Sequence, residues 1–97
     1  MDENRRKKLV ALAAYWASRA SGRSSKSFAA GDTDRAVACL REAGIDIPRL
    51  PRHPFSAAEK LDEFCGELLK EHGMSRWDVP GSYRGAMDLE DELCLDL

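Results

Sequence analysis

The side chains that most often carry catalysis are few in this sequence and lie far apart. The only histidines are His53 and His72, and the three cysteines, Cys39, Cys65 and Cys94, form no CxxC pair. Zinc sites and redox centres are recognised by short spacings between such ligands, which are missing here. A nucleophile, a base and oxyanion donors do not come together in any one motif either. We therefore expect a non-enzymatic protein with no metal site and no cofactor.

The cysteine count and the hydropathy pattern indicate a cytoplasmic protein. An odd number of dispersed cysteines is typical of reduced thiols in a cytosol-like compartment. The main apolar run, residues 9–17, has nine residues, which is far short of the roughly 20 that span a bilayer. Asp2 and Glu3 within the basic start, and Tyr15 and Trp16 within the apolar run, are unusual for a secretory signal. We therefore expect no membrane segment.

Charge is distributed unevenly along the 97 residues, although the net charge is only −2. Residues 1–28 contain seven Lys or Arg and two acids, for a net charge of +5. Residues 61–97 contain three basic and ten acidic residues, for a net charge of −7. Residues 29–60 contain five basic and five acidic residues, so their net charge is zero. Such asymmetry indicates charged partners and does not bear on the fold.

Two long helices are predicted from apolar periodicity and from the residues at their ends. Apolar side chains from Leu9 to Trp16 recur at three- and four-residue spacing, which predicts a helix over about 3–20. Ser56 followed by Glu59 is a capping box, which predicts that a second helix runs over about 57–72. Gly73 can end that helix in the left-handed conformation.

The segment between these two helices predicts a loop and then a shorter helix. Residues 21–31 are rich in Ser and Gly, which favours a loop. Lys26 lies in this loop without the glycines that a phosphate-binding loop requires. A helix over 33–43 would begin at Asp32 or Thr33 as its cap. Gly44 would end it in the same way as Gly73.

Residues 45–54 contain three prolines and allow two interpretations. Pro48, Pro51 and Pro54 form overlapping PxxP patterns beside Arg49 and Arg52, which are typical of ligands of proline-binding domains. Alternatively, the prolines stiffen a connector between helices. The connector interpretation is favoured because this stretch and the residue after it hold four large apolar side chains suited to the core, those of Ile45, Ile47, Leu50 and Phe55.

The last quarter of the sequence predicts a turn, a linker and a short acidic segment. Ser75 and Asp78 form a capping box around a turn at 76–79, which Pro80 must end. That proline and Gly81 also exclude a DNA-recognition helix here. A linker is expected over 82–86. Asp88 would then cap a helix over about 88–96, although the alternating leucines at the end would also fit a strand.

These elements predict an all-α fold in one domain over residues 1–97, a bundle of four to five short helices. Its parts are a basic N-terminal helix, the Pro-rich connector 45–54 and an acidic C-terminal segment. A chain of this length buries about 60–68% of its extended surface, enough for one core without a disulfide or metal. The expected core residues are Leu9, Leu12, Trp16, Val37, Leu40, Leu61, Phe64, Leu68 and Leu69.

Charge therefore carries the functional prediction. We expect a small helical regulator or inhibitor that binds a protein partner with a basic surface, such as a groove that normally holds nucleic acid. By analogy, this describes antitoxins, immunity proteins and phage-encoded inhibitors of defence systems. The acids expected to face outward in one negative patch and bind the partner are Glu63, Glu67, Glu71, Glu90, Asp91 and Glu92. The alternative is a nucleic-acid-binding accessory protein that uses Arg5, Arg6, Lys7, Lys8, Arg19, Arg23 and Lys26.

Overall fold

Four α-helices and one short 3₁₀ turn make up the computed structural model, which describes residues 2–95. The described residues contain no strand, so the predicted all-α fold is confirmed. The elements in chain order are α1 (Glu3–Ser21), α2 (Lys26–Glu42), α3 (Pro54–Glu71), η1 (Arg76–Asp78) and α4 (Tyr83–Leu93). None of the helices in this part of the chain has the length and apolar character needed to cross a membrane.

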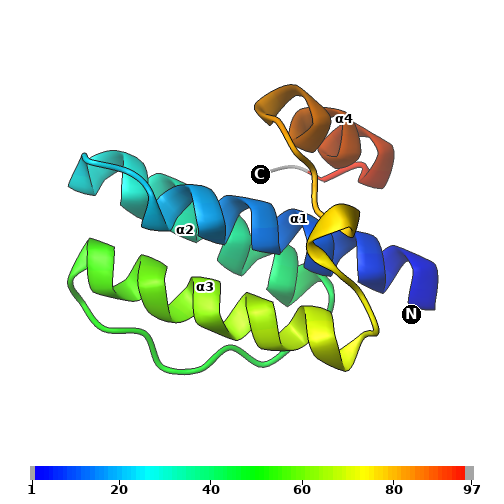
Figure 1. Ribbon diagram of the computed structural model, residues 1–97, viewed down its shortest axis with the longest axis horizontal. Helices are drawn as coiled ribbons and strands as arrows, with labels where there is room; N and C mark the ends of the chain where they lie inside the picture. The colour runs from blue at the N-terminus through cyan, green and yellow to red at the C-terminus, as the bar shows by residue number, and fades with distance from the viewer. Residues whose placement is uncertain (1, 96–97) are drawn as a thin grey trace.

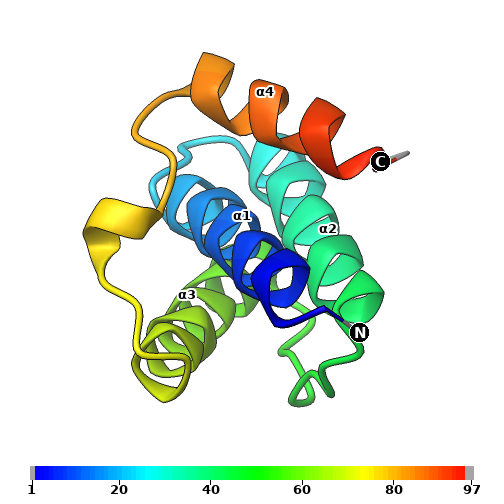
Figure 2. The ribbon, with the colours of Figure 1, turned by 90° about the vertical axis from the view of Figure 1, so that its right-hand side faces the viewer.

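α1 lies at the centre of the bundle and contacts the other three helices. α3 and α4 lie on opposite sides of α1, while α2 runs beside it (Figures 1 and 2). The six consecutive residues from Leu9 to Ala14 are all buried, on every side of the helix. A helix that is apolar all round is one that neighbours surround, and the small alanine side chains let those neighbours approach closely.

The predicted core is confirmed except at two positions. Leu9, Leu12, Trp16, Leu40, Leu61, Leu68 and Leu69 are buried. Val37 and Phe64 are only partly buried and pack against the edge of the core. Both lie at the border of an apolar stripe, where helical spacing alone does not separate buried from half-buried positions.

The two glycine helix ends are confirmed. Gly44 and Gly73 have φ angles of 72° and 67°, in the left-handed region that glycine occupies at little cost. The next amide in each case donates back to the last turn: Ile45 N to the carbonyl of Leu40 at 3.0 Å, and Met74 N to the carbonyl of Leu69 at 2.8 Å. Each helix therefore ends in the hydrogen-bond pattern of a glycine stop.

The predicted starts of α2 and α3 are wrong by several residues. α2 begins at Lys26 rather than residue 33, and Ser25 caps it by accepting a hydrogen bond from the amide of Phe28 at 3.5 Å. Packing on α1 outweighs the cost of about 1 kcal/mol for Gly31 inside the helix. α3 begins at Pro54 rather than after Ser56. Proline suits the first helical position because its φ is already fixed and its missing N–H needs no partner.

The Pro-rich connector packs on the bundle. Ile45, Ile47 and Leu50 are partly buried against the core cluster, as the connector interpretation predicted, whereas Phe55 is partly buried in the first turn of α3 and does not pack on that cluster. Pro51 and Arg52 remain exposed. Apolar side chains thus fix the connector to the bundle while its prolines keep it extended.

The predicted helix over 88–96 also begins earlier than expected. α4 starts at Tyr83, and Ser82 caps it by accepting from the amide of Gly85 at 3.1 Å, so the expected linker over 82–86 is mostly helical and Asp88 is not the cap. The helix ends at Leu93, followed by Cys94 with a φ of 56°. The strand alternative is therefore wrong up to Leu93, and residues 96–97 lie outside the described residues.

Candidate functional site

The acids predicted on the central helix form an exposed row. Glu63, Glu67 and Glu71 are spaced one turn apart on α3 and are all exposed. Glu67 has a cationic neighbour, since its carboxylate lies 3.7 Å from the ammonium group of Lys70. A pair as exposed as this contributes little to stability, so it leaves the carboxylates available to a partner.

Glu90 does not face outward as predicted. It is 5% exposed, accepts a hydrogen bond from Nε1 of Trp16 at 3.0 Å, and lies 3.6 Å from the guanidinium of Arg35. Ala86, Glu90 and Leu93 are the buried residues of α4, so they define its inner face. A buried indole N–H requires an acceptor, and Glu90 supplies it from 74 residues away in the sequence.

The prediction of one negative patch shared by α3 and the C-terminal segment is wrong. The two helices lie on opposite sides of α1 (Figure 2). Glu92 is also paired, because its carboxylate accepts from Nζ of Lys8 at 2.6 Å. Asp91 is exposed on α4. The α3 row is therefore the acidic surface that remains from the prediction.

Four of the seven basic residues proposed for nucleic acid are engaged within the chain. Arg5 donates to the carbonyl of Leu93 at 3.0 Å, and Lys8 pairs with Glu92. Arg19 and Arg23 lie 3.5 and 2.9 Å from the carboxylate of Asp32, which is itself buried. Arg6 and Lys7 are partly buried, and Lys26 is exposed. The structure thus uses much of the basic segment to hold its own elements together.

Trp77 is the largest exposed apolar side chain and was missed by the sequence prediction. It is 96% exposed, in the middle of η1. The predicted capping box is confirmed there, since Asp78 accepts from the amide of Ser75 at 2.9 Å and Ser75 accepts from that of Trp77 at 3.3 Å. The sequence held the signal, because a capping box fixes a turn and a single turn cannot bury both of its faces.

Arg76 ties η1 to the middle of α3. Its guanidinium lies 3.9 Å from the carboxylate of Asp62. A Cβ added at Gly66 would meet the same guanidinium at 3.8 Å, so the arginine side chain crosses that part of α3. Trp77, the next residue, is therefore carried on a turn that lies beside the helix with the acidic row.

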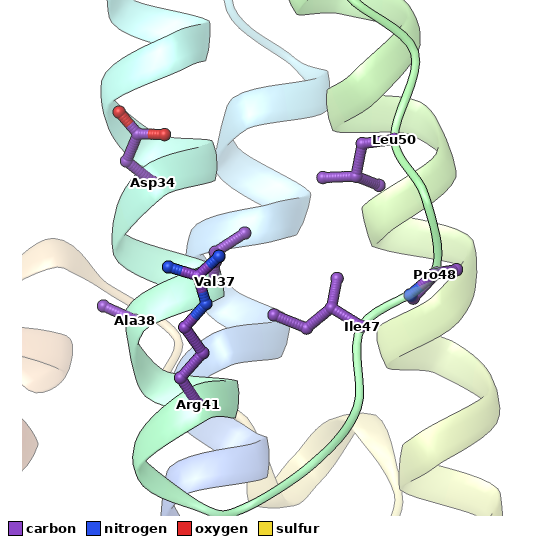
Figure 3. Close-up of a pocket in the computed structure, with 7 residues that line it drawn as sticks. All are labelled: Asp34, Val37, Ala38, Arg41, Ile47, Pro48 and Leu50. Atoms are coloured by element: carbon purple, nitrogen blue, oxygen red, sulfur yellow. The ribbon is translucent and has the colours of Figure 1, made fainter.

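A surface pocket of about 480 Å³ separates α2 from the connector. Ile47 and Leu50 extend from the connector toward Val37 on α2 (Figure 3). The charged residues of the lining are Asp34 and Arg41, both exposed on α2. The pocket is lined by one acid, one guanidinium and an apolar wall, and these groups do not include a nucleophile with a base beside it.

The thiols differ in exposure. Cys39 and Cys65 are buried, whereas Cys94 is exposed. Burial raises the pKa of Cys39 and of Cys65 from the ordinary value of 9.0 to about 12, and the charge of Glu90 contributes at Cys39. Among residues 2–95, no group of three or more His, Cys, Asp or Glu side chains is arranged to hold a metal ion.

These raised pKa values predict a loss of stability at alkaline pH. A thiol with a pKa of about 12 when folded and about 9 when unfolded keeps its proton better in the folded chain. These two thiols therefore leave the free energy of unfolding unchanged at pH values well below 9 and lower it as the pH rises toward 12. Urea titrations at pH 8 and pH 10 measure this. Cys65→Ala should lose less stability between the two pH values than the wild type, and an equal loss would contradict the assignment.

No protein-family model matches the chain. No curated protein and no solved structure matches it either.

Proposed function

We propose that this protein is a non-catalytic regulator or inhibitor that binds a protein partner with a basic surface. The contact surface consists of Trp77 and the exposed row Glu63, Glu67 and Glu71. One observation carries the proposal: a tryptophan that is 96% exposed lies on a turn whose backbone is fixed by a capping box.

An exposed tryptophan is costly to a chain that has no partner for it. Tryptophan is among the residues that contribute most at protein interfaces, where its large ring enters a pocket of the partner. Because the capping box fixes the backbone of η1 before binding, a partner has to order only the side chain of Trp77. These properties support a binding role over a structural one, since the side chain contacts almost nothing in its own chain.

The acidic row supplies the charge complementarity. Three carboxylates one turn apart on α3 attract a basic surface over about 8–10 Å at ordinary ionic strength. A basic surface of that kind is typical of proteins that hold nucleic acid. The proposal therefore extends to occlusion of such a groove, as in antitoxins, immunity proteins and anti-defence inhibitors. The nucleic-acid alternative has less support because Arg5, Lys8, Arg19 and Arg23 are engaged in contacts within the chain.

Replacing Trp77 with alanine should weaken partner binding without affecting the fold. An interface anchor contributes about 2 kcal/mol or more, which corresponds to a loss of roughly 30-fold in affinity. The partner would be identified by capture from the native cytosol, purified, and titrated directly against wild type and variant. Phe28→Ala is the matched control, because Phe28 is 61% exposed at the start of α2. Equal affinity for wild type and W77A would contradict the proposal, as would an equal loss in the control.

Neutralising the acidic row should slow association. Glu63→Gln, Glu67→Gln and Glu71→Gln together remove the steering charge, so the association rate should fall and depend less on salt. A control with Glu3→Gln, Asp34→Asn and Asp46→Asn removes three other exposed acids and changes the net charge equally. An association rate that keeps its size and salt dependence in the α3 variant rules out the acidic row. Capture of nucleic acid instead of a basic protein would favour the alternative function.

A further inference from the structure

Polar contacts hold α4 against the rest of the molecule. Glu90 receives the indole N–H of Trp16 at 3.0 Å and lies 3.6 Å from Arg35. At the end of the helix, Arg5 donates to the carbonyl of Leu93 at 3.0 Å and Lys8 to Glu92 at 2.6 Å. At the start, the guanidinium of Arg19 lies 4.7 Å from the ring centre of Tyr83. Charged groups of α1 and α2 therefore meet α4 along its whole length.

α4 contributes few buried apolar side chains of its own to this docking, although it also covers Trp16 on α1. Ala86 and Leu93 are the only apolar residues of α4 that are buried, while Met87 and Leu89 are half-buried. By contrast, α1, α2 and α3 each contact one another and share a core of buried leucines and alanines. A helix of 11 residues is also too short to be stable alone in water. Loss of the charged contacts would therefore release α4 before the three-helix core unfolds.

The surface under α4 is basic and aromatic. Trp16 is 1% exposed, and Tyr83 of α4 packs edge-on against its ring, with 6.0 Å between the two ring centres. Arg35 lies 4.8 Å from the same indole ring, on the α2 side. The connection to α4 contains Pro80 and Gly81, outside any helix. This short connection gives α4 a hinge and keeps it near the surface that it leaves.

We propose that α4 is a charge-held lid over Trp16 that opens while α1, α2 and α3 remain folded. Opening exposes Trp16 with the cations of Arg5, Lys8, Arg19 and Arg35, all of which α4 contacts when closed. The lid is independent of the α3 surface and of Trp77, so it stands whether or not the proposed function is correct. High salt should open it, because the side chains of Arg5, Lys8 and Arg35 are 36, 37 and 36% exposed, so salt reaches these cations, and the Debye length falls from about 10 Å at 0.1 M to about 3 Å at 1 M.

Trp16 itself reports the opening. The chain has two tryptophans, so Trp77→Phe leaves Trp16 as the only one. Acrylamide quenching of its fluorescence should rise about threefold or more between 0.05 and 1 M NaCl, and its emission should shift to the red. Circular dichroism should retain most of its helical signal over the same range. Unchanged quenching overturns the proposal, and so does a rise that coincides with loss of the whole helical signal.

Charge variants separate a lid from a general loss of packing. Glu90→Gln keeps an acceptor for the indole N–H of Trp16 but removes the charge opposite Arg35, so quenching should be high already at low salt. Glu59→Gln makes the same change at an exposed acid of α3 outside the proposed contact surface and should behave as the parent. Glu92→Lys should also open the lid by repelling Lys8, and adding Lys8→Glu should close it again. Failure of the charge swap to restore protection would show that charge does not hold α4.

The buried thiols provide a second readout in the full chain. Cys39 follows Arg35 by one turn of α2, whereas Cys65 belongs to α3, a helix that lies on the other side of α1 from α4 (Figure 2). In a Cys94→Ser background, a thiol reagent should label Cys39 at least tenfold faster at 1 M than at 0.05 M NaCl. Labelling of Cys65 should not change. Equal acceleration at both thiols would mean global unfolding and would overturn the proposal.

Discussion

Replacing Trp16 with alanine should lower the free energy of unfolding by about 3–5 kcal/mol. The ring is 1% exposed, packs edge-on against Tyr15 and Tyr83, and donates to Glu90 at 3.0 Å. Truncation would leave a cavity between α1 and α4 and would also leave the buried carboxylate without its donor. Since small domains have a total stability of about 5–15 kcal/mol, this loss is a large share of the whole.

Urea denaturation followed by circular dichroism measures this loss. Trp77→Ala makes the same chemical change at a side chain that is 96% exposed, and it should change the stability by less than about 0.5 kcal/mol. Because both variants replace tryptophan with alanine, the difference between their stabilities measures the effect of burial alone. Similar losses in the two variants would contradict the assignment of the two tryptophans to core and surface.

The second large effect is expected at Leu61. This side chain is completely buried in the core cluster on α3, so Leu61→Ala should cost about 2–5 kcal/mol. Phe64→Ala, three residues later, removes more atoms but from a half-buried position, and it should cost less. Melting temperatures of the two variants decide the order. A greater loss at Phe64 would mean that the buried face of α3 is rotated from its position in this structure.

Local signals in the sequence were sufficient for the helix ends that depend on nearby residues. Gly44 and Gly73 end α2 and α3 because a left-handed residue is needed there, and this need is visible in a few residues of sequence. The capping box of Ser75 and Asp78 has the same local character. The apolar spacing likewise predicted most of the core, since a helical stripe depends only on the positions within its own helix.

Features that depend on distant contacts were not predictable in this way. The early start of α2 depends on packing against α1, which overrides the loop composition of residues 21–31. Glu90 looked like a surface acid because its neighbours are acids, and its burial depends on Trp16 and Arg35 in other helices. The candidate site differs from the prediction for this reason. The three acids of α3 are exposed, whereas Glu90 and Glu92 of α4 bind Trp16, Arg35 and Lys8 within the chain.

The central position of α1 has a consequence for synthesis. α1 contacts every other helix, yet it is the first of the four to be made. At roughly 5–20 residues per second, the fifty residues from Gly22 to Glu71 take about 3–10 seconds to follow it. Until α3 is complete, one side of this largely apolar helix has no helix to cover it. The nascent chain should therefore be most prone to aggregation, and most dependent on chaperones, in the interval between the completion of α1 and that of α3.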